Sequence, residues 1–152
     1  MTGSSQHLTV AVVEDDPRIR QLIEDEVVDE GHQVESFVSA ESFLETVNRT
    51  PYNLVLLDLM LPGMNGLECL LTLQSMPWGD QVKPIVIVVT ALNDGEMRQQ
   101  VFEAGASDYI LKPDLFLCLP ELLSRHAEGA AMEPSPLRAS PFGRIPTLTE
   151  SS

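Results

Sequence analysis

Residues 55–66, "VLLDLMLPGMNG", carry the strongest signal for the fold of this chain. The first half of this stretch is a short aliphatic run, which predicts a strand covered on both faces of a sheet. The run ends on the carboxylate of Asp58, and a Pro-Gly turn follows a few residues later. A run that is expected to be buried does not usually end on a carboxylate, and this one also passes directly into a Pro-Gly loop. Asp58 is therefore the first candidate functional residue.

Further strand patterns recur along the chain, mostly as apolar runs and at residues 32–38 as an alternating pattern, and they are separated by segments of helical spacing. Strands are expected at residues 8–13, 32–38, 54–57, 84–90 and 107–113. Helix starts are marked by Asp16 with Pro17, by Ser39, by Gly66, and by Asn93 with Glu96. Strands that alternate with helices predict a parallel sheet with helices on both sides, which is a doubly wound α/β fold.

The length of 152 residues suits one domain with a core. We expect this domain to cover residues 8–126, after an N-terminal extension at 1–7. Residues 127–152 contain repeated prolines and serines and show no apolar period. That composition predicts a flexible Pro/Ser-rich tail or linker.

The chain is strongly acidic, with 23 acidic against 9 basic residues and a formal net charge of −14. This charge repels phosphate backbones and anionic lipids, so we expect no direct binding to nucleic acid or membranes. The sequence shows no apolar run long enough to span a bilayer and no signal-peptide pattern, and a cytoplasmic location is expected. Two cysteines and three scattered histidines suggest neither a disulfide framework nor a zinc cluster.

Charged and polar residues stand where the expected strands end. They are Glu14, Asp15, Asp16, Asp58, Thr90 and Lys112. The carboxyl ends of parallel strands meet at one sheet edge, so these side chains should face one crevice. Carboxylates that lie close together repel one another, and either raised pKa values or a bound divalent cation relieves this repulsion. Oxygen ligands without a nearby His or Cys favour Mg²⁺ as that cation. Taken singly, each residue has a plainer explanation, such as a helix cap for Asp15 or Asp16 and a solvated base for Lys112.

Four motifs in register make the chain similar to a known family. They are "VVEDDPRIR" (12–20), "LLDLMLPGMNG" (56–66), "VVTA" (88–91) and "FEAGASDYILKP" (102–113). With these motifs, residues 8–126 resemble a CheY-like receiver domain from the response regulators of bacterial two-component signalling. The resemblance implies a flavodoxin-like, five-stranded parallel sheet with strand order 2-1-3-4-5 and helices on both faces.

The resemblance also implies a function. Asp58 would accept a phosphoryl group from the phosphohistidine of a sensor histidine kinase or of a phosphotransfer protein. Mg²⁺, or Mn²⁺ in its place, would be held by Asp15, Asp58 and the backbone carbonyl of Met60. Glu14 would hold the ion through a water molecule. The chain would then be a phospho-acceptor signalling domain, with intrinsic phosphotransfer and autodephosphorylation chemistry, rather than an enzyme.

The same resemblance assigns residues that respond to the phosphoryl group. Lys112 would contact a phosphoryl oxygen, and Thr90 would hydrogen-bond the group and draw its loop inward. Tyr109 would change its ring position, although a half-buried strand aromatic explains this residue equally well. Pro113 would follow Lys112 through a cis peptide bond that sets the direction of the lysine.

The chain departs from the family pattern after Pro113. Six largely apolar residues, "DLFLCL" (114–119), separate it from Pro120. Because a proline inside a helix costs about 3 kcal/mol, we expect the last helix to begin near Pro120 and to be short. The large apolar residues of this six-residue segment are Leu115, Phe116, Leu117 and Leu119. They form either core or an apolar docking surface, and core is favoured because exposed apolar patches are uncommon.

A homodimer is a further implication of the resemblance. It would form through the face that the last helix shares with the strand at 107–113 and the helix before it. The charged pairs of that face in one receiver subfamily have counterparts in Asp108, Glu103, Glu121 and Arg125. Ordinary solvated charges explain these residues as well.

Two other classes of function use similar scaffolds. A haloacid-dehalogenase-type phosphatase also has an aspartate nucleophile after an apolar strand, but it needs a second acid where this chain has Met60. A flavodoxin-like cofactor binder needs a hydroxyl- and glycine-rich loop after its first strand, where this chain has three acids. Within the receiver interpretation, the chain is either a stand-alone receiver or the receiver part of a longer DNA-binding transcriptional regulator.

Overall fold

The structure is a computed structural model, and it describes residues 7–131. The expected N-terminal extension lies outside these residues except for His7, and the expected tail lies outside them from residue 132 onward. The boundaries of the domain therefore stay a prediction. No helix in the described range is both long and apolar enough to cross a bilayer.

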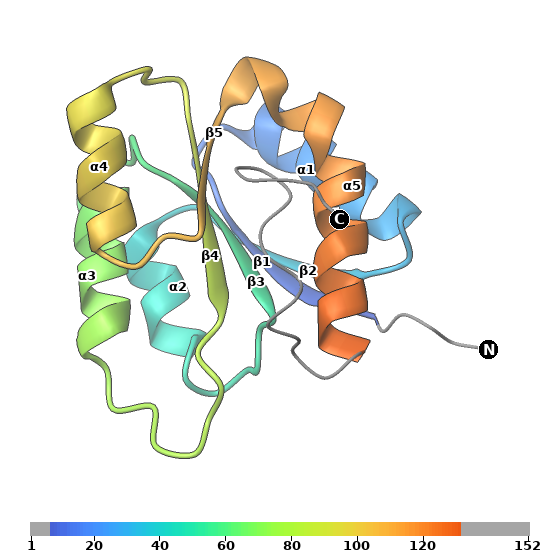
Figure 1. The fold of residues 1–152 in the computed structure, drawn as a ribbon, viewed down its shortest axis with the longest axis horizontal. Coiled ribbons are helices and arrows are strands. Elements are labelled where there is room, and N and C mark those ends of the chain that lie inside the picture. Colours follow the sequence, from blue (N-terminus) through green and yellow to red (C-terminus); the bar gives the residue numbers. More distant parts are fainter. Residues whose placement is uncertain (1–6, 132–152) are drawn as a thin grey trace, which may run out of the picture.

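A five-stranded parallel sheet forms the centre of the fold (Figure 1). Its strands, in chain order, are β1 (Thr9–Val13), β2 (Gln33–Phe37), β3 (Leu54–Asp58), β4 (Ile85–Thr90) and β5 (Asp108–Leu111). In space the strands follow the order β2-β1-β3-β4-β5, and every neighbouring pair is parallel. The doubly wound fold and the strand order implied by the resemblance are confirmed.

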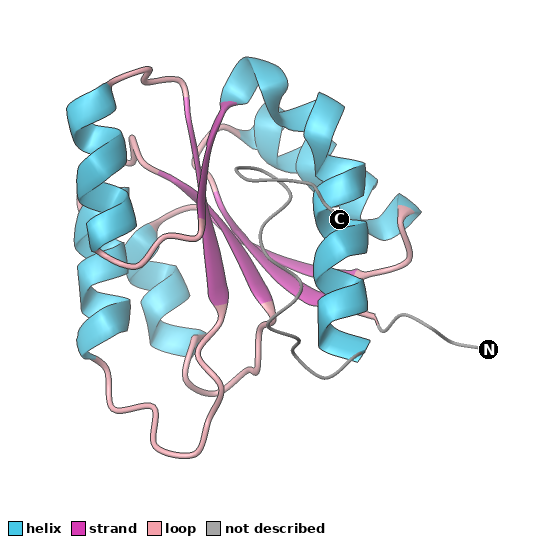
Figure 2. Ribbon diagram, in the orientation of Figure 1, coloured by secondary structure: helices cyan, strands magenta, loops and turns pink. Residues whose placement is uncertain are grey.

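Helices link the strands and cover both faces of the sheet (Figure 2). They are α1 (Pro17–Asp29), α2 (Ala40–Thr46), α3 (Gly66–Ser75), α4 (Gly95–Glu103) and α5 (Lys112–Ala131). α1 and α5 lie on one face, and α2, α3 and α4 lie on the other. This division follows from the parallel sheet, in which each connection must cross over one face or the other.

Two apolar cores result, one on each face, and β3 contributes to both. Val55 and Leu57 pack with α2, α3 and α4, whereas Leu54 and Leu56 pack with α1 and α5. Successive side chains of a strand point to opposite faces, so one continuous aliphatic run fills both cores. The run thereby sets the position of Asp58, which is its last residue.

Side-chain caps determine where several helices begin. Asp16 caps α1 and Ser39 caps α2, as the sequence predicts. α4 is capped by Asp94, and the prediction of Asn93 as its cap is wrong by one residue. The Asp94 carboxylate accepts two backbone N–H groups of the first turn. A carboxylate is also favoured there by the partial positive charge at the helix N-terminus, which an amide does not exploit.

The last helix begins earlier and runs farther than predicted. α5 starts at Lys112 and continues for 20 residues with Pro120 inside it, so the short helix expected near Pro120 is wrong. The reason is burial against the core shared with α1. The almost fully buried leucines of α5 are Leu115, Leu119, Leu122 and Leu123. Each contributes about 1.5–3 kcal/mol, which together exceeds the ~3 kcal/mol that an internal proline costs.

The apolar segment before Pro120 divides between core and surface. Leu115 and Leu119 are core, as favoured, whereas Phe116 and Leu117 are 37% and 85% exposed. Figure 1 shows that α5 changes direction partway along its length, and an internal proline is a usual cause of such a bend. The docking alternative therefore concerns Phe116 and Leu117 alone.

Pro113 is the second residue of α5. No peptide bond among the described residues is cis, so the expected cis bond between Lys112 and Pro113 is wrong. Proline suits the first turn of a helix, because its φ is already helical and it has no N–H to leave unpaired there. The direction of Lys112 is therefore set by the start of α5 and by the ion pairs that the side chain makes.

Candidate functional site

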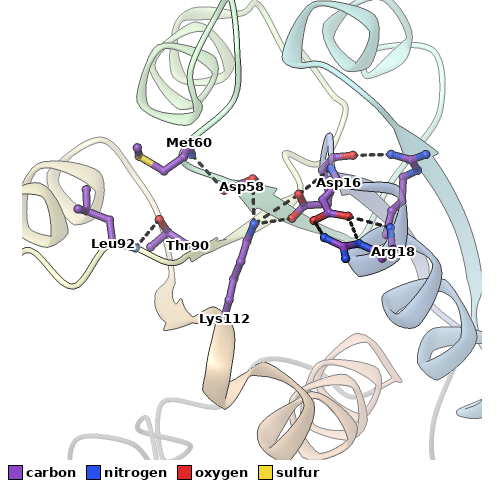
Figure 3. A network of polar contacts seen from close by, with 9 residues as sticks. Asp16, Arg18, Asp58, Met60, Thr90, Leu92 and Lys112 are labelled. Carbon is purple, nitrogen blue, oxygen red and sulfur yellow. Dashed lines mark hydrogen bonds and ion pairs between the residues drawn. The ribbon is translucent and has the colours of Figure 1, made fainter.

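The expected site residues meet at the carboxyl edge of the sheet (Figure 3). Glu14 follows β1, Asp58 ends β3, Thr90 ends β4, and Lys112 follows β5. The ends of adjacent parallel strands lie side by side, so residues far apart in the chain become neighbours. The structure thus brings these four residues to one place.

Lys112 joins the two buried acids of the site. Its Nζ lies 3.1 Å from Oε1 of Glu14 and 3.2 Å from Oδ2 of Asp58. Both carboxylates are only 2% exposed. One ammonium compensates one of the two carboxylates, so a negative charge remains in a buried place. An uncompensated buried charge is unfavourable, and the site therefore favours the approach of a further cation.

The pKa values of Glu14 and Lys112 are both shifted in this environment. Burial raises the pKa of Glu14, while the backbone N–H of Asp16, 3.0 Å from Oε2, acts in the opposite direction. The negative charge of Asp58 raises the pKa of Glu14 further. Burial by itself lowers the pKa of Lys112, but the two carboxylates outweigh it and the pKa is raised. Lys112 is therefore an ammonium at neutral pH.

Three carboxylates could hold a metal ion. Glu14, Asp15 and Asp58 each bring one oxygen into a group whose members lie within 4.8 Å of one another. All of the donors are oxygen atoms, which fits a hard divalent cation such as Mg²⁺. Asp15 is exposed, so the group is open to solvent on its side and leaves room for the water ligands that Mg²⁺ retains.

Met60 contacts Asp58 through its backbone N–H. This group donates to Oδ1 of Asp58 at 3.0 Å, while Oδ2 faces Lys112. The two oxygens of the carboxylate therefore have different partners, and the side chain is held in one orientation. The metal role expected for Met60 uses its carbonyl, and that role stays a prediction.

Gly66 allows the loop after β3 to pass close to Asp58. A Cβ at this position would lie 2.6 Å from the Asp58 carbonyl oxygen and 2.7 Å from Cα of Leu59. The Gly66 N–H donates to the Leu59 carbonyl at 3.0 Å. Only a residue without a side chain fits there, so the second glycine of the opening stretch helps to shape the site.

Thr90 and Tyr109 are linked through Leu92. The N–H of Leu92 donates to Oγ1 of Thr90 at 3.0 Å, and the hydroxyl of Tyr109 donates to the carbonyl of Leu92. Thr90 and Tyr109 are both buried, so Tyr109 is less exposed than the half-buried strand aromatic that the sequence allows. Burial raises the pKa of the Tyr109 phenol. One short loop thus connects the end of β4 to the aromatic ring of β5.

The side chain of Asp16 serves α1 rather than the site. Its carboxylate accepts the N–H of Arg18 at 2.9 Å and pairs with the Arg18 guanidinium at 3.3 Å. The pairing with Arg18 also lowers the pKa of Asp16. The plainer explanation of this acid, a helix cap, is therefore right.

Arg20 is a site neighbour that the sequence does not single out. Its Nη1 donates to the backbone carbonyl of Glu14 at 2.8 Å. An arginine in the first turn of a helix that follows three acids is a weak signal. The partner is a backbone atom, whose direction no sequence pattern reveals.

The chain matches the family model described as "Response regulator receiver domain" over residues 10–117. Response regulator ArlR of Staphylococcus saprophyticus is 35% identical over 116 residues, which are 76% of this chain and 49% of that protein. Transcriptional regulatory protein TcrA of Mycobacterium tuberculosis is 30% identical over 146 residues, which are 96% of this chain and 52% of that protein. The chain thus spans about half the length of these two curated relatives.

A solved structure described as the BeF3-activated DrrB receiver domain shares the fold. It aligns with a TM-score of 0.69 and 31% sequence identity, and the alignment covers 81% of this chain and 99% of that one. The standard role of the family in two-component systems is to take up a phosphoryl group and to control an output. Because the family model matches well over half of the residues and the fold agrees with a solved member, this chain belongs to the response-regulator receiver domain family.

Proposed function

We propose that Asp58 accepts the phosphoryl group, from a phosphohistidine of a sensor histidine kinase or of a phosphotransfer protein. The observation that carries this proposal is the Asp58 carboxylate itself, buried at the end of the central strand with Lys112 3.2 Å away. The receiver is a signalling domain. Its intrinsic chemistry would be the phosphotransfer and the later hydrolysis of the product.

The transfer needs one carboxylate oxygen and one leaving group. An oxygen of Asp58 attacks the phosphorus atom, and an O–P bond forms as the P–N bond to the donor imidazole breaks. The electron pair of the broken bond stays on the imidazole nitrogen, which then takes a proton. Lys112 is placed to pair with the oxygens of the arriving group, because its ammonium already contacts the nucleophile.

The acids beside Asp58 support a divalent cation requirement. Asp15 and Asp58 would hold Mg²⁺, or Mn²⁺ in its place, with the Met60 carbonyl, and Glu14 would act through water. When bound, the ion supplies positive charge that offsets the charge of the phosphoryl oxygens. Lys112 and the Met60 N–H meanwhile keep the Asp58 carboxylate oriented.

The response would pass through the loop that carries Leu92. The Oγ1 of Thr90 already accepts one hydrogen bond from that loop, and its hydroxyl proton is available to donate to a phosphoryl oxygen. A shift of Thr90 would move Leu92, which is also the acceptor of the Tyr109 hydroxyl. Thr90, Lys112 and Tyr109 are therefore proposed as the residues that sense the phosphoryl group.

Acetyl phosphate with Mg²⁺ tests the acceptor. We expect one phosphoryl adduct, about 80 Da by intact mass, that is labile in the way of an acyl phosphate. Asp58→Asn should abolish it, whereas Asp16→Asn, which removes a neighbouring acid that serves α1, should label normally. Labelling of Asp58→Asn at the wild-type level would place the acceptor elsewhere. Asp15→Asn should keep Asp58 but label slowly and bind Mg²⁺ weakly.

A homodimer through the α4, β5 and α5 face is proposed as a partner state. The exposed Phe116 and Leu117 support it, since exposed apolar side chains on one helix favour association. Light scattering with and without acetyl phosphate tests the dimer, and a monomer in both states at high concentration would exclude it.

We also propose that this chain does not bind nucleic acid directly. Its net charge of −14 supports this, because it repels a phosphate backbone.

A further inference from the structure

The turn between β1 and α1 carries two of the three clustered acids, Glu14 and Asp15. Glu14 is held at each of its polar groups. Its N–H donates to the Phe37 carbonyl at 3.0 Å, and its carboxylate meets Lys112 at 3.1 Å. Its backbone carbonyl accepts a hydrogen bond from Arg20 at 2.8 Å. The orientation of Glu14 is thus defined at both ends of the residue.

Asp15 differs from Glu14 because its side chain is exposed. Its carboxylate makes no hydrogen bond or ion pair with any residue between 7 and 131, so the backbone, and no side-chain partner in that range, sets the direction in which the side chain leaves the chain. The carbonyl of Glu14 and the N–H of Asp15 belong to one planar peptide unit. A guanidinium that holds this carbonyl therefore fixes the plane from which the Asp15 side chain departs.

We propose that Arg20 is a positioning residue for cation binding, which orients Asp15 and Glu14 by holding the peptide unit between them. The inference rests on the proposed function, in which these acids hold Mg²⁺. Arg20 itself touches neither the ion nor the transferred group in this proposal. Its contribution is geometric. Arg20 lies in the first turn of α1, and its guanidinium reaches the backbone carbonyl of Glu14, the residue that follows β1.

The charge of Arg20 and its positioning role act on cation affinity in opposite directions. A guanidinium near a cation site repels the ion, so loss of its charge alone strengthens Mg²⁺ binding. Loss of the hydrogen bond frees the peptide unit and weakens Mg²⁺ binding. Partners that orient metal ligands typically change affinity by about 10- to 100-fold when they are removed. The sign of the change therefore distinguishes the two effects.

The experiment is a calorimetric titration of the 152-residue chain with magnesium chloride. Arg20→Met and Arg20→Gln remove the guanidinium, and whichever of them folds is sufficient. Arg18→Gln is the matched control, because Arg18 lies on the same turn, has a side chain that is 88% exposed, and within residues 7–131 pairs with no acid other than the helix cap Asp16. We expect the Arg20 variants to bind Mg²⁺ about tenfold more weakly or worse, while Arg18→Gln binds as tightly as the wild type or slightly more tightly. Arg20→Lys should recover part of the affinity, because its ammonium can donate one hydrogen bond to the same carbonyl.

Two controls separate the possible failures. If the wild type binds no Mg²⁺, or if Asp15→Asn binds it normally, the proposed metal role is wrong. If the wild type binds and Asp15→Asn does not, but the folded Arg20→Met or Arg20→Gln binds as tightly as the wild type or more tightly, then Arg20 has no positioning role. A urea unfolding curve of each variant shows that the titrated protein is folded. If Arg20 had a purely structural role, its substitution would lower the midpoint of that curve without changing the Mg²⁺ affinity of the folded chain.

Discussion

The Nζ of Lys112 lies 3.2 Å from Oδ2 of Asp58, although the two residues are 54 positions apart in the chain. β3 brings one of them to the sheet edge and β5 brings the other, with only β4 between these strands. The contact places an ammonium beside the proposed nucleophile before any phosphoryl group arrives. A substitution that removes the ammonium of Lys112 should therefore affect the phosphoryl transfer and the binding of the metal ion differently.

Lys112→Met should slow phosphorylation of Asp58 by acetyl phosphate by about 100-fold, since it removes a cation aimed at the developing charge. Mg²⁺ should bind at least as tightly as in the wild type, because a competing positive charge is gone. Rates are measured by intact mass against time, and affinities by calorimetry. Lys83→Met is the control, because Lys83 is exposed and contacts Gln74 instead of the site acids. A wild-type rate in Lys112→Met would remove the lysine from the mechanism.

Gly66→Ala should lower the free energy of unfolding by about 1–3 kcal/mol, because its Cβ would overlap the backbone of Asp58 and Leu59. The displaced Asp58 should also label more slowly with acetyl phosphate. Gly95→Ala is the matched control, since nothing lies within 4 Å of a Cβ there and the residue is in α4. That variant should be as stable as the wild type or more stable by up to ~1 kcal/mol. Equal urea midpoints for the two variants would mean that the loop does not approach Asp58 so closely.

Pro120→Ala should raise the free energy of unfolding by about 1–3 kcal/mol, because it restores a backbone N–H inside α5. Urea denaturation followed by circular dichroism measures the change. A proline in the first turn of a helix is favourable, so a helix that began near Pro120 would instead be destabilised by this substitution. A loss of stability would therefore contradict the long α5.

His32 should make the stability depend on pH below neutrality. Its Nδ1 accepts the N–H of Leu8 at 3.0 Å, and burial lowers its pKa from the ordinary value of 6.5, with the charge of His7 acting in the same direction and Glu30 opposing it. The unfolded chain then binds the proton more readily than the folded one. This contribution is present above pH 6.5 and is lost as the pH falls below that value.

His32→Asn tests this dependence, because its amide oxygen can accept the same hydrogen bond and does not titrate. We expect the wild type to lose more stability than His32→Asn between pH 8 and pH 5.5 in urea unfolding experiments at matched ionic strength. The comparison cancels the other titrating groups. Parallel losses in the two proteins would show that His32 is protonated equally in the folded and unfolded states.

The doubly wound fold and the residues that meet at the site can be predicted from the amino-acid sequence. Four of the five strands, β1, β3, β4 and β5, are short and largely apolar, and a polar residue either ends the strand or follows it directly. The alternation of strands with helices therefore predicts the sheet, and the polar residues at these strand ends predict Glu14, Asp58, Thr90 and Lys112. These signals are local in the sequence. They predict the fold correctly because the central strands are buried on both faces, which leaves little freedom in their register. The cap of α1 can also be predicted from a local signal, since Asp16 contacts the first turn of the helix that it caps.

The course of α5 and the contacts that surround the acids depend instead on packing between distant parts of the chain. α5 keeps Pro120 within it because its leucines bury against α1 and the sheet, and that free energy comes from residues distant in the chain. The close approach of Gly66 to Asp58 and the hydrogen bond from Arg20 to Glu14 involve backbone atoms. Backbone direction in a loop is set by packing rather than by residue type, and for this reason the sequence names the acids of the site while the fold decides how they are held.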